Sequence, residues 1–170
     1  MFLQRQIGWG ALIAALMLII FCGFSQADSI KGILTLDGRQ IALTYVEGFF
    51  DPKADSIVLF FASAPPGRPV SKIWELRHME AGRKGAVVVE FNNVSKKKLD
   101  MAAVSLDLNH ESLQDGYLNE GLGTNSYDMT VKEFKAVKGG VLKGSFIRKS
   151  NTAFGHTWSA DIQYFEVTLK

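Results

Sequence analysis

Hydrophobic and polar positions form their clearest pattern at the C-terminal end of the chain, over residues 139–170. Two apolar runs, at residues 141–147 and 158–169, flank a ten-residue polar connection at residues 148–157. Two strand-like runs separated by a polar connection are typical of a β-hairpin. The pattern therefore predicts one long hairpin that closes a sheet.

The second run of this hairpin changes its parity near residue 164. A strict period of two would place its apolar residues on both faces of one strand, so the strand needs a bulge or a cover on each face. A strand of this kind can contact two apolar layers, as in a sandwich or a rolled barrel. The two sets are Trp158, Ala160, Ile162 and Tyr164, and then Phe165, Val167 and Leu169.

Two further patterns support a sheet protein with more than one layer. Residues 30–36 and 40–45 alternate around Asp37-Gly38, and Asp-Gly between such runs is a strong hairpin signal. Residues 56–63 are apolar without alternation, which predicts a central strand covered on both faces.

The patterns of the remaining segments also indicate a mainly β fold. Residues 86–91, 99–108 and 126–134 are expected to be strands, and residues 71–81 are expected to form one short α-helix that ends at Gly82. The prediction is an antiparallel β-sandwich or rolled β-barrel with one short helix.

The first 27 residues predict a targeting signal. Arg5 precedes an almost unbroken apolar run at residues 11–24, and Ser25-Gln26-Ala27 has small residues where a signal peptidase cleaves. We expect a signal peptide at residues 1–27 and a single β-rich domain at residues 28–170. The alternatives are a retained membrane anchor and a lipoprotein acylated at Cys22, although the preceding Phe21 is larger than such signals use.

Composition and charge indicate where the protein is located and which partners it could bind. The chain has 170 residues, 47% hydrophobic and 21% charged, with nineteen Lys and Arg against seventeen Asp and Glu. This balance does not favour nucleic acid as a partner. Cys22 is the single cysteine, so a chain cleaved after Ala27 has no disulfide and no thiol. A periplasmic or secreted location is expected, with membrane contact only through an uncleaved leader.

Catalytic and metal-binding motifs do not emerge from the mature segment. It lacks Gly-x-Ser-x-Gly, and His78, His110 and His156 stand more than thirty residues apart in the sequence. No calcium-loop spacing is found among the acidic residues at 107–125. We therefore predict no catalytic residue, no metal and no cofactor, and expect a non-enzymatic protein, with an enzyme as the alternative.

Candidate ligand-binding residues come from two connections. The 148–157 connection combines Arg148, Phe154 and His156, and mixed polar and aromatic loops on rigid strands often bind ligands. The adjacent aromatic residues Phe49 and Phe50 are a second candidate, as a stacking platform. An ordinary solvated loop and a pair of core rings are the alternative interpretations.

The order of these elements resembles small exported bacterial β-rich domains of uncharacterised function. The resemblance rests on the Gly-x-Leu-Thr-Leu-Asp-Gly hairpin at residues 32–38, the apolar strand that ends in Pro65-Pro66, and the Leu-Lys-Gly-Ser-Phe and Phe-Glu-Val-Thr-Leu strands at residues 142–146 and 165–169. It implies a bacterial envelope domain and no site residues. The expected function is an exported binding or interaction domain for an unknown protein or glycan ligand. The alternatives are an envelope-polymer hydrolase with a loop-built site and a purely structural accessory protein.

Overall fold

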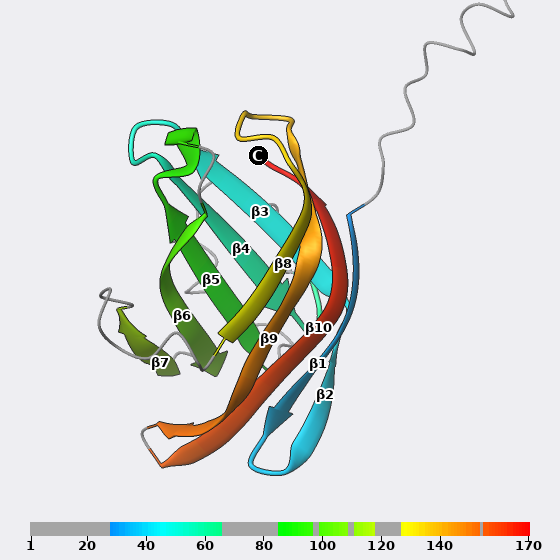
Figure 1. The fold of residues 1–170 in the computed structure, drawn as a ribbon. Coiled ribbons are helices and arrows are strands. Elements are labelled where there is room, and N and C mark those ends of the chain that lie inside the picture. The colour runs from blue at the N-terminus through cyan, green and yellow to red at the C-terminus, as the bar shows by residue number, and fades with distance from the viewer. Residues whose placement is uncertain (1–27, 66–84, 97–98, 109–110, 118–126, 154) are drawn as a thin grey trace, which may run out of the picture.

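The computed structural model describes residues 28–65, 85–96, 99–108, 111–117, 127–153 and 155–170. This part of the chain is mainly β, with two five-stranded antiparallel sheets that face each other (Figure 1). Sheet A has the strand order β2-β1-β10-β9-β8, and sheet B has the order β3-β4-β5-β6-β7. The strands are β1 (Ser29–Leu36), β2 (Arg39–Leu43), β3 (Tyr45–Asp51), β4 (Ser56–Ala62), β5 (Ala86–Asn92), β6 (Asp100–Leu108), β7 (Glu111–Tyr117), β8 (Tyr127–Phe134), β9 (Val141–Ala153) and β10 (His156–Thr168).

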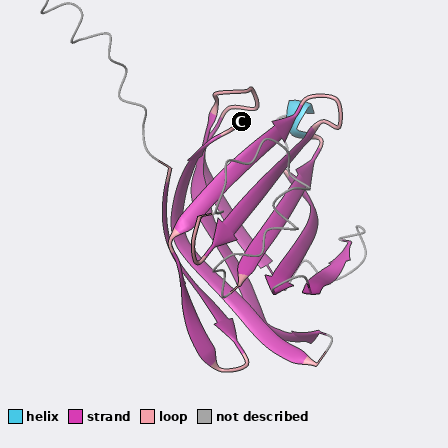
Figure 2. Cartoon of the chain, turned by 180° about the vertical axis from the view of Figure 1, so that it is seen from behind, coloured by secondary structure: helices cyan, strands magenta, loops and turns pink. Residues whose placement is uncertain are grey.

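Strands dominate the view from behind as well, and the helical element drawn there is the 3₁₀ turn η1 (Val94–Lys96) (Figure 2). The α-helix predicted at residues 71–81 and the signal peptide predicted at residues 1–27 lie outside the described residues. Among the described residues, no helix has the length and apolar character needed to cross a membrane.

The two sheets share one hydrophobic core. Sheet A contributes Leu34, Phe146 and Trp158, and sheet B contributes Phe91 and Leu106, all with at most 1% of their surface exposed. Phe61 of sheet B meets Phe165 of sheet A edge to face, with ring centroids 5.3 Å apart. Such contacts between large rings stabilise the pairing of the two sheets.

Both faces of β4 are buried, as its unbroken apolar sequence predicts. Ile57, Leu59 and Phe61 belong to the core between the sheets. Val58 and Phe60 point to the opposite face and form a second apolar cluster with Phe49 and Val88, among others. The prediction of a strand covered on both sides is confirmed.

A bulge in β10 explains the parity change in its sequence. The register between β10 and β9 shifts between Ile162 and Phe165, and β1 has a matching irregularity between Lys31 and Gly32. The bulge rotates the strand by one residue, so Phe165, Val167 and Leu169 enter the same core as Trp158 and Ile162.

The end of β10 joins sheet A to sheet B, and we call this junction the seam. Leu169 forms a parallel bridge with Gly48 of β3. The amide of Lys170 donates to the Gly48 carbonyl at 2.9 Å, and the amide of Phe50 donates to the Lys170 carbonyl at 3.1 Å. Glycine suits position 48 because an added Cβ would lie 2.9 Å from Leu169 Cδ2.

The closing hairpin is more regular than its sequence suggests. β9 continues to Ala153 and β10 begins at His156, so residues expected in a ten-residue loop pair as strands. The prediction of a long loop is wrong. This end of the hairpin is polar because it extends past the core, so it has no apolar face that would mark it as a strand. Cross-strand pairs such as Thr152 with Thr157 hold it together.

Candidate functional site

The structure separates the two groups of predicted binding residues. Of the predicted residues, Phe50 lies beside Lys170, and Arg148 pairs with Ala160. Residue 160 lies in β10 and residue 170 lies two positions beyond its end, and ten extended residues correspond to about 30 Å. Arg148 and the Phe49–Phe50 pair therefore belong to opposite ends of the molecule.

Phe49 and Phe50 do not form a stacking platform together. Phe49 is buried in the outer cluster of sheet B, and Phe50 is half-buried against the core between the sheets. Successive residues of a strand point to opposite faces, so the two rings are directed apart. Phe154 lies outside the described residues.

Arg148 points into the space between the sheets and is 1% exposed. Its guanidinium carbon lies 3.7 Å from the centre of the Trp158 ring, and its Nη1 donates to the carbonyls of Trp158 at 2.6 Å and Lys149 at 3.0 Å. The stacking and the two carbonyls compensate part of the cost of burying a permanent charge.

The indole of Trp158 supplies a second buried donor. Its Nε1 is buried and has no hydrogen-bond partner within the part of the chain that the structure describes. A buried donor without an acceptor costs about 1–3 kcal/mol, so such groups in a native protein call for an explanation. A ligand that supplies an acceptor oxygen would satisfy this N–H.

His156 stands two residues before Trp158 on β10 and is tied to the first hairpin. Its Nδ1 lies 2.8 Å from Oδ2 of Asp37, whose other carboxylate oxygen accepts the Thr157 amide at 2.9 Å. The amide of Asp37 donates to the Thr157 carbonyl at 2.8 Å. The hydrogen bond from His156 lowers the pKa of Asp37 below its ordinary value.

Asp37 can occupy this turn because its backbone adopts a left-handed conformation, with φ at 48°, followed by Gly38 at 78°. Two positive φ values in succession are what a type I′ turn requires, and Asp-Gly satisfies them at low cost. The turn presents the Asp37 carboxylate to β10. We call the group formed by Asp37, Arg148, His156 and Trp158 the hairpin-end site.

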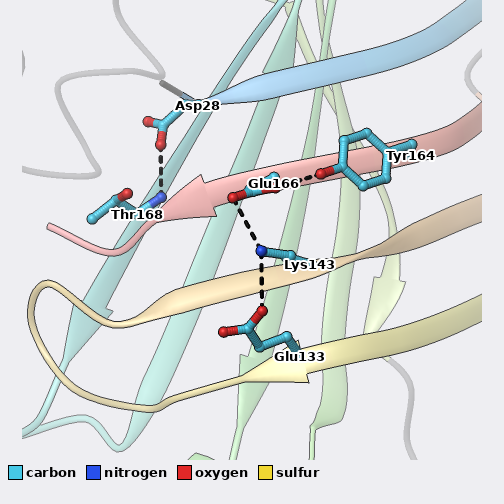
Figure 3. A network of polar contacts seen from close by, with 6 residues as sticks. All are labelled: Asp28, Glu133, Lys143, Tyr164, Glu166 and Thr168. Carbon is cyan, nitrogen blue, oxygen red and sulfur yellow. Dashed lines mark hydrogen bonds and ion pairs between the residues drawn. The ribbon is translucent and has the colours of Figure 1, made fainter. Parts of the chain in front are cut away.

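A second polar group lies on the outer face of sheet A near the seam (Figure 3). Lys143 of β9 stands between two carboxylates, with Nζ 3.1 Å from Glu133 and 3.2 Å from Glu166. Tyr164 donates its hydroxyl to Glu166, which is 6% exposed. Glu133 and then Glu166 raise the pKa of Lys143, and the bond to Glu166 raises the pKa of Tyr164.

The start of the described chain reaches the same area. The Asp28 carboxylate accepts the amide of Thr168 at 2.7 Å (Figure 3). Ser29 is the direct cross-strand partner of Glu166. The beginning of β1 and the end of β10 are thereby fixed to each other beside the seam.

A related arrangement occurs on sheet B. Glu47 is 1% exposed, receives the hydroxyl of Tyr45 at 2.7 Å, and forms an ion pair with Lys170. Burial and the contact with Glu47 raise the pKa of Tyr45. Lys170 Nζ also lies 5.8 Å from the Phe49 ring centre.

Sequence reasoning missed both buried carboxylates. The available signal was a Tyr-x-Glu triplet that occurs at Tyr45–Glu47 and again at Tyr164–Glu166. Residues i and i+2 of a strand share a face, so each hydroxyl can reach its carboxylate. The lysines could not be assigned from the sequence, since they come from other strands.

Comparisons with known proteins returned no match: no family model, no curated protein and no solved structure is similar to this chain. Among the described residues, no group of three or more His, Cys, Asp or Glu side chains is placed to hold a metal ion. The interpretation of the hairpin-end site therefore rests on its own geometry.

Replacing Asp37 with Asn tests the contact between the two hairpins. Because the pKa of Asp37 is lowered in the folded protein, its ionised form stabilises the fold above the unfolded pKa, and that contribution is lost as pH falls through the folded pKa. We expect the D37N variant to melt at a lower temperature than the parent at neutral pH, with the difference shrinking at about pH 3. Thermal unfolding at both pH values measures this.

The exposed Asp161, on the outer face of sheet A, provides the matched control as Asp161→Asn. This variant should show no comparable pH-dependent loss. A D37N deficit that stays constant from neutral to acidic pH would contradict the role of the Asp37 charge.

Replacing Lys170 with Met tests the ion pair of Glu47. The substitution leaves a carboxylate that is 1% exposed without its ammonium partner, whereas Lys170 itself is 50% exposed. Breaking a fully buried pair costs roughly 3–5 kcal/mol, and the exposure of Lys170 reduces the expected loss to about 1–2 kcal/mol. Urea unfolding measures this loss.

The double variant E47Q/K170M should recover part of the loss, because a neutral amide needs no counter-ion. Lys149→Met, at a lysine that is 60% exposed, is the control and should change the free energy of unfolding little. Equal stability of the K170M variant and the parent protein would rule out the proposed role of the pair.

Proposed function

We propose that this protein is an exported, non-enzymatic binding domain of the bacterial envelope, periplasmic or secreted, built as a β-sandwich that is rolled together at the seam. The ligand is an acceptor-rich molecule with an anionic group, held at the hairpin-end site. The observation that carries this proposal is the buried Arg148 guanidinium stacked on Trp158, beside an indole N–H without an acceptor in the described chain.

The chemistry of the site favours a carboxylate next to an aromatic or apolar group. Arg148 and Trp158 supply a permanent positive charge and an N–H donor, and charge-assisted hydrogen bonds to carboxylates are among the strongest in proteins. The surrounding core offers apolar contact, since Tyr127 and Phe146 stack at 6.2 Å on the neighbouring strands. Asp37 and His156, both partly exposed, form the rim of the site.

A hydrolase of an envelope polymer is the second candidate, and the contact between Asp37 and His156 is the observation that favours it. A carboxylate bound to Nδ1 leaves Nε2 for proton transfer. A hydrolase also needs a nucleophile or an activated water within about 3 Å of that nitrogen. No residue in the described ranges makes such a contact with His156. Binding is therefore our first proposal.

Export is tested by expressing the full chain in a bacterium and recovering it from the envelope fraction. We expect the N-terminal sequence to begin at Asp28, because small residues precede that position and β1 begins directly after it, at Ser29. Protein that begins at Met1 would support the retained anchor, and acylation at Cys22 would support the lipoprotein alternative. Either result would overturn cleavage after Ala27.

Ligand binding is tested by calorimetric titration of the exported protein with 4-phenylbutyrate. The uncharged 4-phenylbutanol is the control ligand, which should bind at least about tenfold more weakly because it lacks the charge. Arg148→Gln should reduce the affinity for the carboxylate by about tenfold or more, and Trp158→Phe should reduce it while preserving an aromatic ring.

Lys149→Gln is the control variant, because Lys149 neighbours Arg148 in sequence but is 60% exposed. Circular dichroism verifies that each variant folds. Equal affinity for the carboxylate and the alcohol, or equal affinity of the parent protein and the W158F variant, would refute the assignment of the donors.

A further inference from the structure

In the described part of the chain, strand β8 forms an open edge of sheet A. Within the described residues, β8 is hydrogen-bonded to β9 on one side and is the last strand of its sheet. Its residues from Thr130 to Glu133 are exposed, as is Asp128. Unpaired strand edges can accept another strand through their backbone groups.

The four edge strands of the two sheets differ in what they could accept. The edge of β3 carries the C-terminal bridge from Leu169. The charged residue of β2 is Arg39, and the charged residues of β7 are Glu111 and Asp115. Each of these strands carries charges of one sign, so a pair of identical copies could not form an attractive contact between opposite charges. β8 contains both signs, with Asp128, Lys132 and Glu133.

The order of residues in β8 is complementary to itself. If two copies align antiparallel with Thr130 opposite Thr130, residues whose numbers sum to 260 face each other. Asp128 of each copy then faces Lys132 of the other, and Met129 faces Val131. Opposite charges, and apolar pairs, directly across two strands stabilise their pairing.

The exposure of the charged side chains allows this pairing. Asp128 is 68% exposed, and its intramolecular contact with Lys149 is a distant 4.0 Å. Val131, the cross-strand partner of Gly144 in β9, is 39% exposed. The register with β9 is regular from Tyr127 to Val131 and shifts between Val131 and Glu133. The long side chain of Lys132 can reach across this irregularity.

We propose that two copies of this chain associate through β8, as an antiparallel pair centred on Thr130 that joins two A sheets into one ten-stranded sheet. The dimer is symmetric, so each contact occurs twice. A single strand pair buries less surface than stable dimers usually do, so the association is weak and depends on concentration.

Sedimentation velocity over a wide range of protein concentration tests the proposal with charge-reversal variants. The parent protein should shift from monomer to dimer as concentration rises. Asp128→Lys places two lysines opposite each other at both ends of the pair, and Lys132→Asp places two aspartates there. Each single variant should raise the dissociation constant by about tenfold or more, because like charges directly opposite are destabilising.

The double variant D128K/K132D restores opposite charges across the pair and should return to dimerisation. Asp161→Lys, which lies on the face of sheet A in β10 and not on its edge, is the control and should dimerise like the parent protein. A parent protein that stays monomeric at all concentrations would overturn the proposal. Single variants that dimerise normally, or a double variant that does not recover, would overturn the register.

Discussion

The structure depends on one strand that serves two sheets. β10 pairs with β1 and β9 along its length and reaches β3 at its end through Leu169. The apolar residues of β10 change parity near Tyr164, so a regular strand would direct Trp158 and Phe165 to opposite faces of the sheet. The bulge between Ile162 and Phe165 makes that change, so Trp158 and Phe165 enter the same core.

Three charged side chains are buried among the described residues. Arg148, Glu47 and Glu166 are all at least nine-tenths buried, and each has partners that reduce the cost of its burial. Both carboxylates have a lysine partner: Glu47 pairs with Lys170 at the seam, and Glu166 pairs with Lys143 on the outer face of sheet A. Arg148 stacks on Trp158 and donates to backbone carbonyls.

Much of the fold could be predicted because its signals are local. The Asp37-Gly38 turn and the double burial of β4 follow from residue types at neighbouring positions. For β10 the sequence left two possibilities, a bulge or a cover on each face, and the structure has the bulge. The protruding part of the closing hairpin could not be predicted in this way. Apart from Arg148, the side chains whose burial is described at residues 148–157 are exposed or half-buried, so the sequence has the composition of a loop although the backbone is paired.

For the polar and aromatic residues of this chain, the sequence by itself determined which side chains are chemically able to bind a ligand, because that depends on residue type alone. Only the tertiary structure decided which of them meet. Asp37 contacts His156 and Glu47 contacts Lys170 across separations of 119 and 123 residues. Periodicity reports which face of a strand is buried and carries no information on which distant strand lies beside it. The same limit explains why Phe49 and Phe50 could be suggested as one platform when the strand directs their rings apart.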